Sequence, residues 1–231
     1  MINVRRSKNR GHANHGWLDS YHTFSFGEFM DADFMGFRSL RVINEDNVAP
    51  DMGFGSHPHR DMEILSYVIT GELKHQDNMG NTSVIKAGNL QKITAGTGIT
   101  HSEFNPSTTT SVHFLQIWII PRDRGLKPSY QEQSLSPTST NSLVLVGSSI
   151  PTTGVIEFNQ DVDIYRGTLS KGTNERFVIR QGRGVWIQMI KGTMTVNDQE
   201  LFPSDGAAIE GLNDITITPF NDVEFLLFDL A

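Results

Sequence analysis

Residues 63–77 of the 231-residue chain are EILSYVITGELKHQD, an apolar run and a shorter alternating run separated by Thr70-Gly71-Glu72. Two β-favouring runs joined by so short a glycine-containing turn predict an antiparallel hairpin. Further runs follow at residues 83–86, 90–94 and 112–120, with turn residues between them. Many short strands with turn signals between them are typical of an antiparallel barrel or jelly roll, so we expect an all-β fold.

Other parts of the chain extend this pattern. Residues 21–26 alternate and should form a strand that ends at Gly27, and residues 39–43 should form another. Residues 121–142 are rich in Pro, Ser, Thr and Gln and predict a linker or a long surface connection. A second β series follows, in which residues 185–192 resemble residues 65–71 with their flank, and residues 204–206 resemble residues 86–88. This weak internal repeat predicts two β modules in one chain.

The expected boundaries are residues 1–130 for the first module and 131–231 for a linker and the second module. We also allow that the first residues of the chain pack on the second barrel. Aligning the two halves of the repeat places Val178 and Arg180 at the positions of His57 and His59. It places Pro219 and Asn221 at the positions of His101 and Glu103. The second module is therefore expected to lack metal ligands.

Composition excludes several classes of protein. Hydrophobic residues make up 37% and charged residues 19%, which is typical of a globular chain. The net charge of −7 disfavours attachment to phosphate backbones, so no direct nucleic-acid partner is expected. There is no 18-residue apolar run, so no membrane association is expected. The basic N-terminus has no apolar core behind it, so we expect a cytoplasmic protein.

The chain has no cysteine, so a transition-metal site would have to use other ligands. His57-Pro-His59 and His101-Ser-Glu103 are two pairs with i, i+2 spacing, which on strands places both side chains of a pair on one face. An isolated His-x-His is more often a solvated loop, but four matched positions favour metal binding. Gly96 and Gly98 allow the sharp bend needed to bring the second pair beside the first.

Such a set suits one divalent transition ion. Imidazole binds Fe, Cu, Ni and Zn, and a carboxylate favours harder ions that keep open positions for substrate. Glu63 and Glu103 compete for the acidic position, because both share strand parity with the histidines near them. Spacing leaves this choice open.

The remaining candidates are less specific. Met52, Phe54 and Met62 flank the ligand pairs and predict either an apolar mouth for an aromatic substrate or ordinary core. His12, His15 and His22 are expected to be surface or hydrogen-bonded core histidines rather than ligands, and His75 and His113 are expected to be structural.

The whole pattern resembles the cupin signature: His57-x-His59-xxx-Glu63, then Gly71, then Gly98-xx-His101-xxx-Asn105. Gly96 departs from that signature, which usually has proline there. The fuller resemblance is to the pirin family. It is carried by residues 55–60 (GSHPHR) with Met62-Glu63, and by residues 94–103 (TAGTGITHSE), 21–27 (YHTFSFG) and 115–118 (LQIW).

The resemblance implies a bicupin: two antiparallel β-barrel or jelly-roll cupin domains in one chain. In the pirin family the acid two residues past the last histidine is the ligand, which implies a metal set of His57, His59, His101 and Glu103. Glu63 is then a candidate to orient a ligating histidine. Fe(II) is the first expectation for the metal, with Mn, Co, Ni, Cu and Zn as alternatives.

The implied activity is that of a quercetin 2,3-dioxygenase, in which flavonol and O2 are activated at the metal and the ring opens with release of carbon monoxide. Glu103 would be both ligand and catalytic base. An alternative within the family is an iron-dependent regulatory protein that binds a transcription-related protein partner without turnover. A cupin isomerase or hydrolase for sugars or small acids is a third alternative, disfavoured by the Met and Phe residues near the ligands.

Overall fold

The computed structural model describes residues 1–135 and 141–231, and within them it contains strands, turns and one short 3₁₀ helix, η1 (Ser7–Asn9). The chain divides into two compact units. The first unit is Gly11–Leu135, and the second unit combines Met1–Arg10 with the described residues of Ser136–Ala231. No helix in the described part of the chain is long and apolar enough to cross a membrane.

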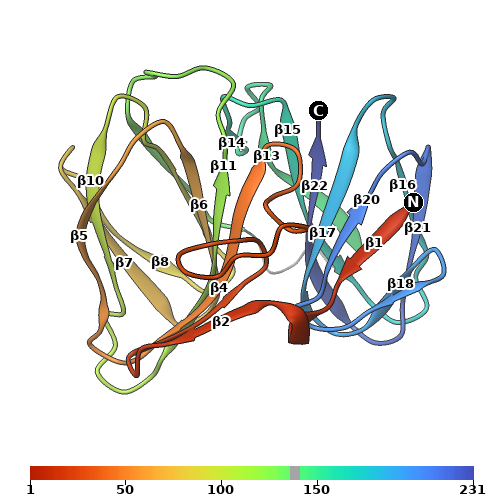
Figure 1. Cartoon of the computed structure of the whole chain (residues 1–231), viewed down its shortest axis with the longest axis horizontal. Helices are drawn as coiled ribbons and strands as arrows, with labels where there is room; N and C mark the ends of the chain where they lie inside the picture. The colour runs from red at the N-terminus through yellow and green to blue at the C-terminus, as the bar shows by residue number, and fades with distance from the viewer. Residues whose placement is uncertain (136–140) are drawn as a thin grey trace. The chain divides into compact units, whose positions relative to one another are not determined.

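The first unit consists of two sheets (Figure 1). Its seven-stranded sheet has the order β12 (Ser129–Gln133), β9 (Leu90–Thr94), β6 (Glu63–Thr70), β11 (Val112–Ile119), β4 (Leu40–Val48), β3 (Leu18–His22) and β2 (Gly11–Asn14). Its four-stranded sheet has the order β5 (Gly53–His59), β10 (Ile99–Phe104), β7 (Glu72–Asp77) and β8 (Thr82–Lys86). All of these strand pairs are antiparallel.

The second unit also consists of two sheets, in which β13 and β14 pair in parallel and the other strand pairs are antiparallel. Its seven-stranded sheet has the order β1 (Ile2–Arg5), β20 (Gly206–Ile209), β17 (Gly184–Lys191), β22 (Val223–Leu230), β15 (Val162–Leu169), β13 (Ser142–Ser148) and β14 (Ile156–Glu157). Its four-stranded sheet has the order β16 (Glu175–Val178), β21 (Asp214–Pro219), β18 (Met194–Val196) and β19 (Gln199–Leu201). The prediction of an all-β chain with two jelly-roll modules is confirmed, and each module is a pair of open sheets rather than one closed barrel.

Apolar side chains fill the space inside each unit. In the first unit one buried cluster contains Val68, Leu73, Ile85 and Phe114, contributed by strands of both sheets. In the second unit a larger cluster contains Ile187, Ile215, Ile217 and Phe225, again from both sheets. Burying this apolar surface is the main favourable term in folding.

Two sequence-based expectations need correction. The strand expected over residues 21–26 ends at His22, because β3 pairs with β4 only from Leu18 to His22. Ser25 and its neighbours instead form a turn, in which the Ser25 hydroxyl donates to Asp31 O at 2.9 Å. The connection expected over residues 121–142 contains strand β12, which pairs with β9, while residues 136–140 of it lie outside the described residues.

Candidate metal centre

His57, His59 and His101 lie together in the first unit. β5 ends with His57 and His59 on one face, and antiparallel pairing with β10 makes His101 the Cα partner of His57. Ring centroids are 4.8 Å apart for His57 and His59, 4.5 Å for His57 and His101, and 5.0 Å for His59 and His101. One ring nitrogen from each of the three lies within 4.8 Å of the others, which is close enough for a shared metal ion.

The bend before β10 depends on two glycines. Gly96 and Gly98 have φ angles of +47° and +139°, a region that favours glycine. A Cβ atom at Gly96 would overlap the backbone oxygen of Leu126. Glycine is therefore required where the cupin signature usually has proline, and the bend leads directly into the strand that carries His101.

Each of the three imidazoles can offer a ring nitrogen to a metal ion. Burial, with repulsion from neighbouring histidines, lowers the pKa of His59 to about 4 and that of His101 to about 3, so both rings are neutral at pH 7. The Nδ1–H of His57 donates to Gly55 O at 2.8 Å, which leaves its Nε2 lone pair available.

His101 provides the clearest test of whether a metal fits. It is 1% exposed, and neither of its ring nitrogens has a hydrogen-bond partner among the described residues. Buried polar atoms in proteins are almost always paired, so a ring with two unpaired nitrogens indicates that something else binds there. A divalent transition ion is the partner that a cluster of neutral imidazoles suits.

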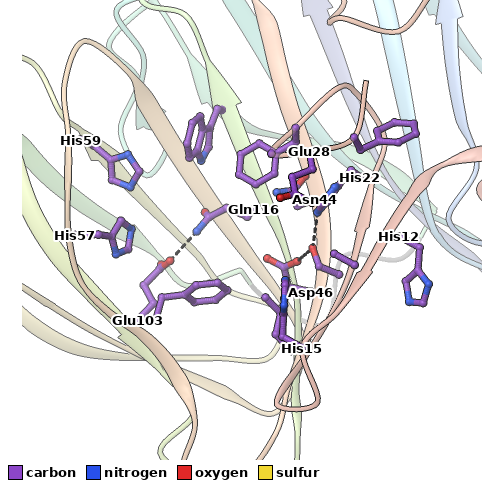
Figure 2. A pocket seen from close by; sticks show the side chains of 18 residues that line it. His12, His15, His22, Glu28, Asn44, Asp46, His57, His59, Glu103 and Gln116 are labelled. Carbon is purple, nitrogen blue, oxygen red and sulfur yellow. Dashed lines mark hydrogen bonds between the residues drawn. The ribbon is translucent and has the colours of Figure 1, made fainter. Parts of the chain in front are cut away.

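Glu103 is buried beside this cluster at 1% exposure. A β-bulge places its extra residue on β5, while the register of β10 with β7 stays regular, so His101 and Glu103 keep the strand alternation and lie on one face. Its carboxylate accepts a hydrogen bond from Gln116 Nε2 at 2.6 Å (Figure 2). It also accepts hydrogen bonds from Ser66 Oγ at 3.1 Å and from Gln91 Nε2. Three neutral donors thus hold the carboxylate in one orientation.

The donors to Glu103 belong to a polar row across the seven-stranded sheet. Each member of this row is the Cα partner of the next across neighbouring strands. In order, the members are His22 on β3, Asn44 on β4, Gln116 on β11, Ser66 on β6 and Gln91 on β9. The sequence alone does not reveal this row. The signal was present as single polar residues inside apolar strands, but parity alone does not tell which strands are neighbours.

Glu63, the competing acid, has a different partner. Lys92 Nζ lies 2.6 Å from Glu63 Oε1, with side-chain exposures of 1% and 0%. Lys92 Nζ also donates to Thr94 Oγ1 at 2.5 Å. Glu63 is thus held in a buried ion pair, and neither of the two groups of potential metal ligands in the described residues contains it.

The second of these groups consists of His75, His101 and Glu103. His75 was expected to be structural, yet it is fully buried and its ring centroid lies 5.5 Å from that of His101. Its Nε2 is 3.1 Å from Asp77 Oδ2, its ring stacks on Tyr130, and its Nδ1 has no hydrogen-bond partner among the described residues. His75 is the Cα partner of Glu103, a relation that only the register shows.

The corresponding positions of the second unit are apolar. β16 pairs with β21 as β5 pairs with β10, with Phe177 opposite Ile215. Ile217, two residues after Ile215, is the Cα partner of Val196 on β18, and Ile179 N donates to Asn213 O. Of the residues that the repeat alignment selected, Val178 lies on the exposed face opposite to Phe177, whereas Pro219 alternates with Ile215 and Ile217 on the buried face. Both metal-ligand groups of the described residues lie in the first unit.

A cavity of about 580 Å³ opens beside the histidine cluster, within the usual size range of small-molecule pockets. His57, His59 and Glu103 contribute to its lining. The aromatic and aliphatic part of the lining is Ala13, Leu18, Phe26, Phe29, Phe54 and Trp118. The other polar side chains are His12, His15, Ser20, His22, Glu28, Asn44, Asp46 and Gln116 (Figure 2).

This lining bears on two expectations from the sequence. Of the three apolar flanking residues, Phe54 lines the cavity, Met62 packs against the buried Ile64 cluster and Met52 is 46% exposed. His12, His15 and His22 were expected to be surface or hydrogen-bonded core histidines rather than ligands; all three contribute to the cavity lining, and neither metal-ligand group of the described residues contains them. Their sequence spacing matches no metal template, and the cavity is formed by elements that only tertiary folding brings together.

Comparison with known proteins gives consistent matches over the whole chain. A family model described as Pirin matches residues 3–119, and one described as Quercetinase C-terminal cupin domain matches residues 145–230. The chain is 47% identical to the quercetin 2,3-dioxygenase of Escherichia coli K12 over 230 residues, covering 100% of this chain and 99% of the relative. It is 36% identical to the Pirin-like protein of Caulobacter vibrioides over 235 residues, covering 100% of both chains.

Two solved structures are also similar to this chain over its whole length. The crystal structure of YhhW from Escherichia coli is similar with a TM-score of 0.97 at 47% identity, covering 100% of this chain and 98% of that one. The structure of the bacterial pirin YhhW in complex with nickel(II) is similar with a TM-score of 0.95 at 46% identity, covering 100% and 99%.

Proposed function

The chain belongs to the pirin family, and we propose that it is a metal-dependent dioxygenase that cleaves flavonols such as quercetin. The observation that carries this proposal is the cluster of His57, His59 and His101 beside a cavity of about 580 Å³ with aromatic lining. The name and the 47% identity of the Escherichia coli relative support the choice of substrate class.

We propose His57, His59, His101 and Glu103 as the ligands of one divalent transition ion. Three neutral imidazoles and one carboxylate would leave such a site with a net charge of about +1. When bound, the ion supplies Lewis acidity and a place where a chelating flavonol and O2 meet. Fe(II) is our first choice, and the nickel(II) complex of the relative supports including Ni(II) in the tests.

The proposed role of Glu103 is to accept the proton of the flavonol 3-hydroxyl. Its carboxylate is buried, and Gln116, Ser66 and Gln91 donate hydrogen bonds that fix its orientation. A general base must be within hydrogen-bond reach of the proton that it takes, and Glu103 lines the cavity. The apolar lining would hold the planar rings and exclude water.

The atoms of the proposed reaction balance with flavonol and O2 as the only reactants. One flavonol and one O2 give one ring-opened ester, which keeps both oxygen atoms of O2, and one molecule of carbon monoxide. The test is to load metal-free protein with Fe, Mn, Co or Ni and incubate each form with quercetin in air. We expect loss of the flavonol absorbance and evolution of carbon monoxide for at least one metal.

His101→Ala should abolish turnover, whereas His113→Ala is a matched control, because His113 bonds to Glu45 outside the cluster. If metal is demonstrably bound and no form turns over, the dioxygenase proposal fails. In that case the regulatory alternative, with a protein partner and no turnover, becomes the better hypothesis. That partner and the cytoplasmic location stay predictions from the sequence.

A further inference from the structure

Four polar residues form a second wall of the cavity, which we call the acceptor wall: Ser20, His22, Asn44 and Asp46. They come from β3 and β4, where His22 pairs with Asn44 and Ser20 pairs with Asp46. Each is at most 7% exposed, and neither potential metal group contains any of them. In the view of Figure 2, Gln116 lies between Asn44 and Asp46 of this wall and the two histidines His57 and His59.

Hydrogen bonds fix the Asp46 carboxyl in this wall. The Ser20 hydroxyl donates to Asp46 Oδ1 at 2.5 Å, so its oxygen is free to accept from His22 Nε2 at 3.0 Å. The donors run in one direction, from His22 through Ser20 to Asp46. The second carboxyl oxygen, Oδ2, accepts no hydrogen bond from a described residue.

Asn44 has an unused acceptor next to this carboxyl. The side chain is 4% exposed, and its Oδ1 atom is buried with no hydrogen-bond partner among the described residues. Asn44 and Asp46 are two residues apart on one strand, so both side chains are on the face that lines the cavity. Unpaired buried acceptors are rare, and in a cavity they indicate that a ligand supplies the donor.

We propose that Asn44 and Asp46 form a specificity site that accepts hydrogen bonds from aromatic hydroxyl groups of the substrate. This inference rests on the proposed function and deepens it: the hydroxyls are those remote from the 3-hydroxyl that the histidine cluster would engage. Two acceptors need donors, and the apolar lining by Phe26, Phe29 and Leu18 suits the ring that carries these hydroxyls. A site built to hydrogen-bond a hydroxyl discriminates strongly against an analogue that lacks it.

The experiment compares quercetin with 3-hydroxyflavone, which shares the 3-hydroxy-4-keto unit but has no other hydroxyl. Binding to metal-loaded protein is titrated without oxygen by the optical shift of the flavonol, and turnover is measured separately in air. Wild-type protein should bind quercetin at least about tenfold more tightly, since one hydrogen bond is worth about that factor. Asn44→Leu should reduce the preference to about threefold or less.

Asn47→Leu is the matched control, because Asn47 lies on the same strand and is absent from the cavity lining. It should retain the wild-type preference. The thermal midpoint of Asn44→Leu should equal or exceed that of wild type, since an unpaired buried acceptor is removed. If the leucine variant does not fold, Asn44→Ala removes the same acceptor and is measured instead.

Equal affinity of wild-type protein for both flavonols overturns the inference. A preference that persists in Asn44→Leu, or failure of both flavonols to bind, overturns it as well. Failure of the dioxygenase proposal is distinguishable: the binding preference would depend on Asn44 as stated, while no metal form consumed quercetin in air.

Discussion

Gln116 Nε2 donates a hydrogen bond of 2.6 Å to Glu103 Oε2. Gln116 is on β11 of the seven-stranded sheet and Glu103 on β10 of the four-stranded sheet, so this bond links the two sheets across the interior of the first unit. The acid proposed as a ligand is therefore oriented by a side chain that approaches it from the opposite sheet.

Replacing this donor should weaken metal binding. Gln116→Leu leaves one oxygen of Glu103 without its amide partner, and loss of such an outer contact typically costs 10- to 100-fold in metal affinity. Isothermal titration of metal-free protein measures the effect. Gln76→Leu is the control, because Gln76 is exposed on β7. Equal affinities in Gln116→Leu and wild type would show that the amide does not support a ligand.

Replacing His101 should separate stability from metal binding. Both ring nitrogens of His101 are buried and unpaired, so His101→Leu should raise the free energy of unfolding of the metal-free protein by about 1–3 kcal/mol. The same variant should lose more than about 100-fold in metal affinity, since a ligand matters more than its outer contacts. Urea unfolding with and without metal tests both. A variant that is still stabilised by added metal would contradict the assignment.

His75 distinguishes the two groups of potential ligands. His75→Phe preserves an aromatic ring against Tyr130 but removes the nitrogen donor. If the ion is held by His57, His59, His101 and Glu103, the variant should keep its metal affinity within about tenfold. Elemental analysis after dialysis provides the measurement. Loss of the metal from His75→Phe, with retention in His57→Ala, would move the site to His75, His101 and Glu103.

The dependence of metal affinity on pH should be shallow. Three ordinary imidazoles, with pKa values of about 6.5, would make affinity fall steeply below that pH as each takes up a proton. Burial lowers the pKa of His59 to about 4 and that of His101 to about 3. Between pH 7 and pH 5 these two rings stay neutral. Affinity should therefore fall by at most about tenfold per pH unit, and a hundredfold fall per unit would contradict this.

Asp46 should make stability depend on pH in the opposite direction to a paired carboxylate. Burial, opposed by the Ser20 hydrogen bond, raises the pKa of Asp46 from 3.8 to about 7. Between these values the folded protein binds more protons at this group than the unfolded chain does, so the free energy of unfolding falls as the pH rises.

Asp46→Asn removes this ionisation while it keeps an acceptor for Ser20. Relative to wild type, the metal-free variant should gain up to about 4 kcal/mol at pH 8 and much less near pH 4. Urea unfolding at both pH values measures the difference. Asp33→Asn, at an exposed position, should show no such gain. A gain that is equal at both pH values would mean that Asp46 does not titrate as stated.

Much of the fold follows from local patterns. The run at residues 90–94 became β9 without change, and the run at 112–120 became β11 with its last residue outside the strand. The expectation failed over residues 23–26, where aromatic side chains favour a strand but the chain turns back to hydrogen-bond Ser25 with Asp31. The local β propensity of these residues does not predict the contact with Asp31, because tertiary contacts override local propensity.

The sequence by itself determined the two i, i+2 pairs and the glycines of the bend, because side-chain alternation and positive φ angles are local properties. Only the tertiary structure decided that His101 lies opposite His57, and that Lys92 neutralises Glu63 while neutral amides hold Glu103. It also placed Asn44 and Asp46 in the cavity wall. Register and burial depend on which distant strands become neighbours, and strand parity specifies a face without specifying what that face meets.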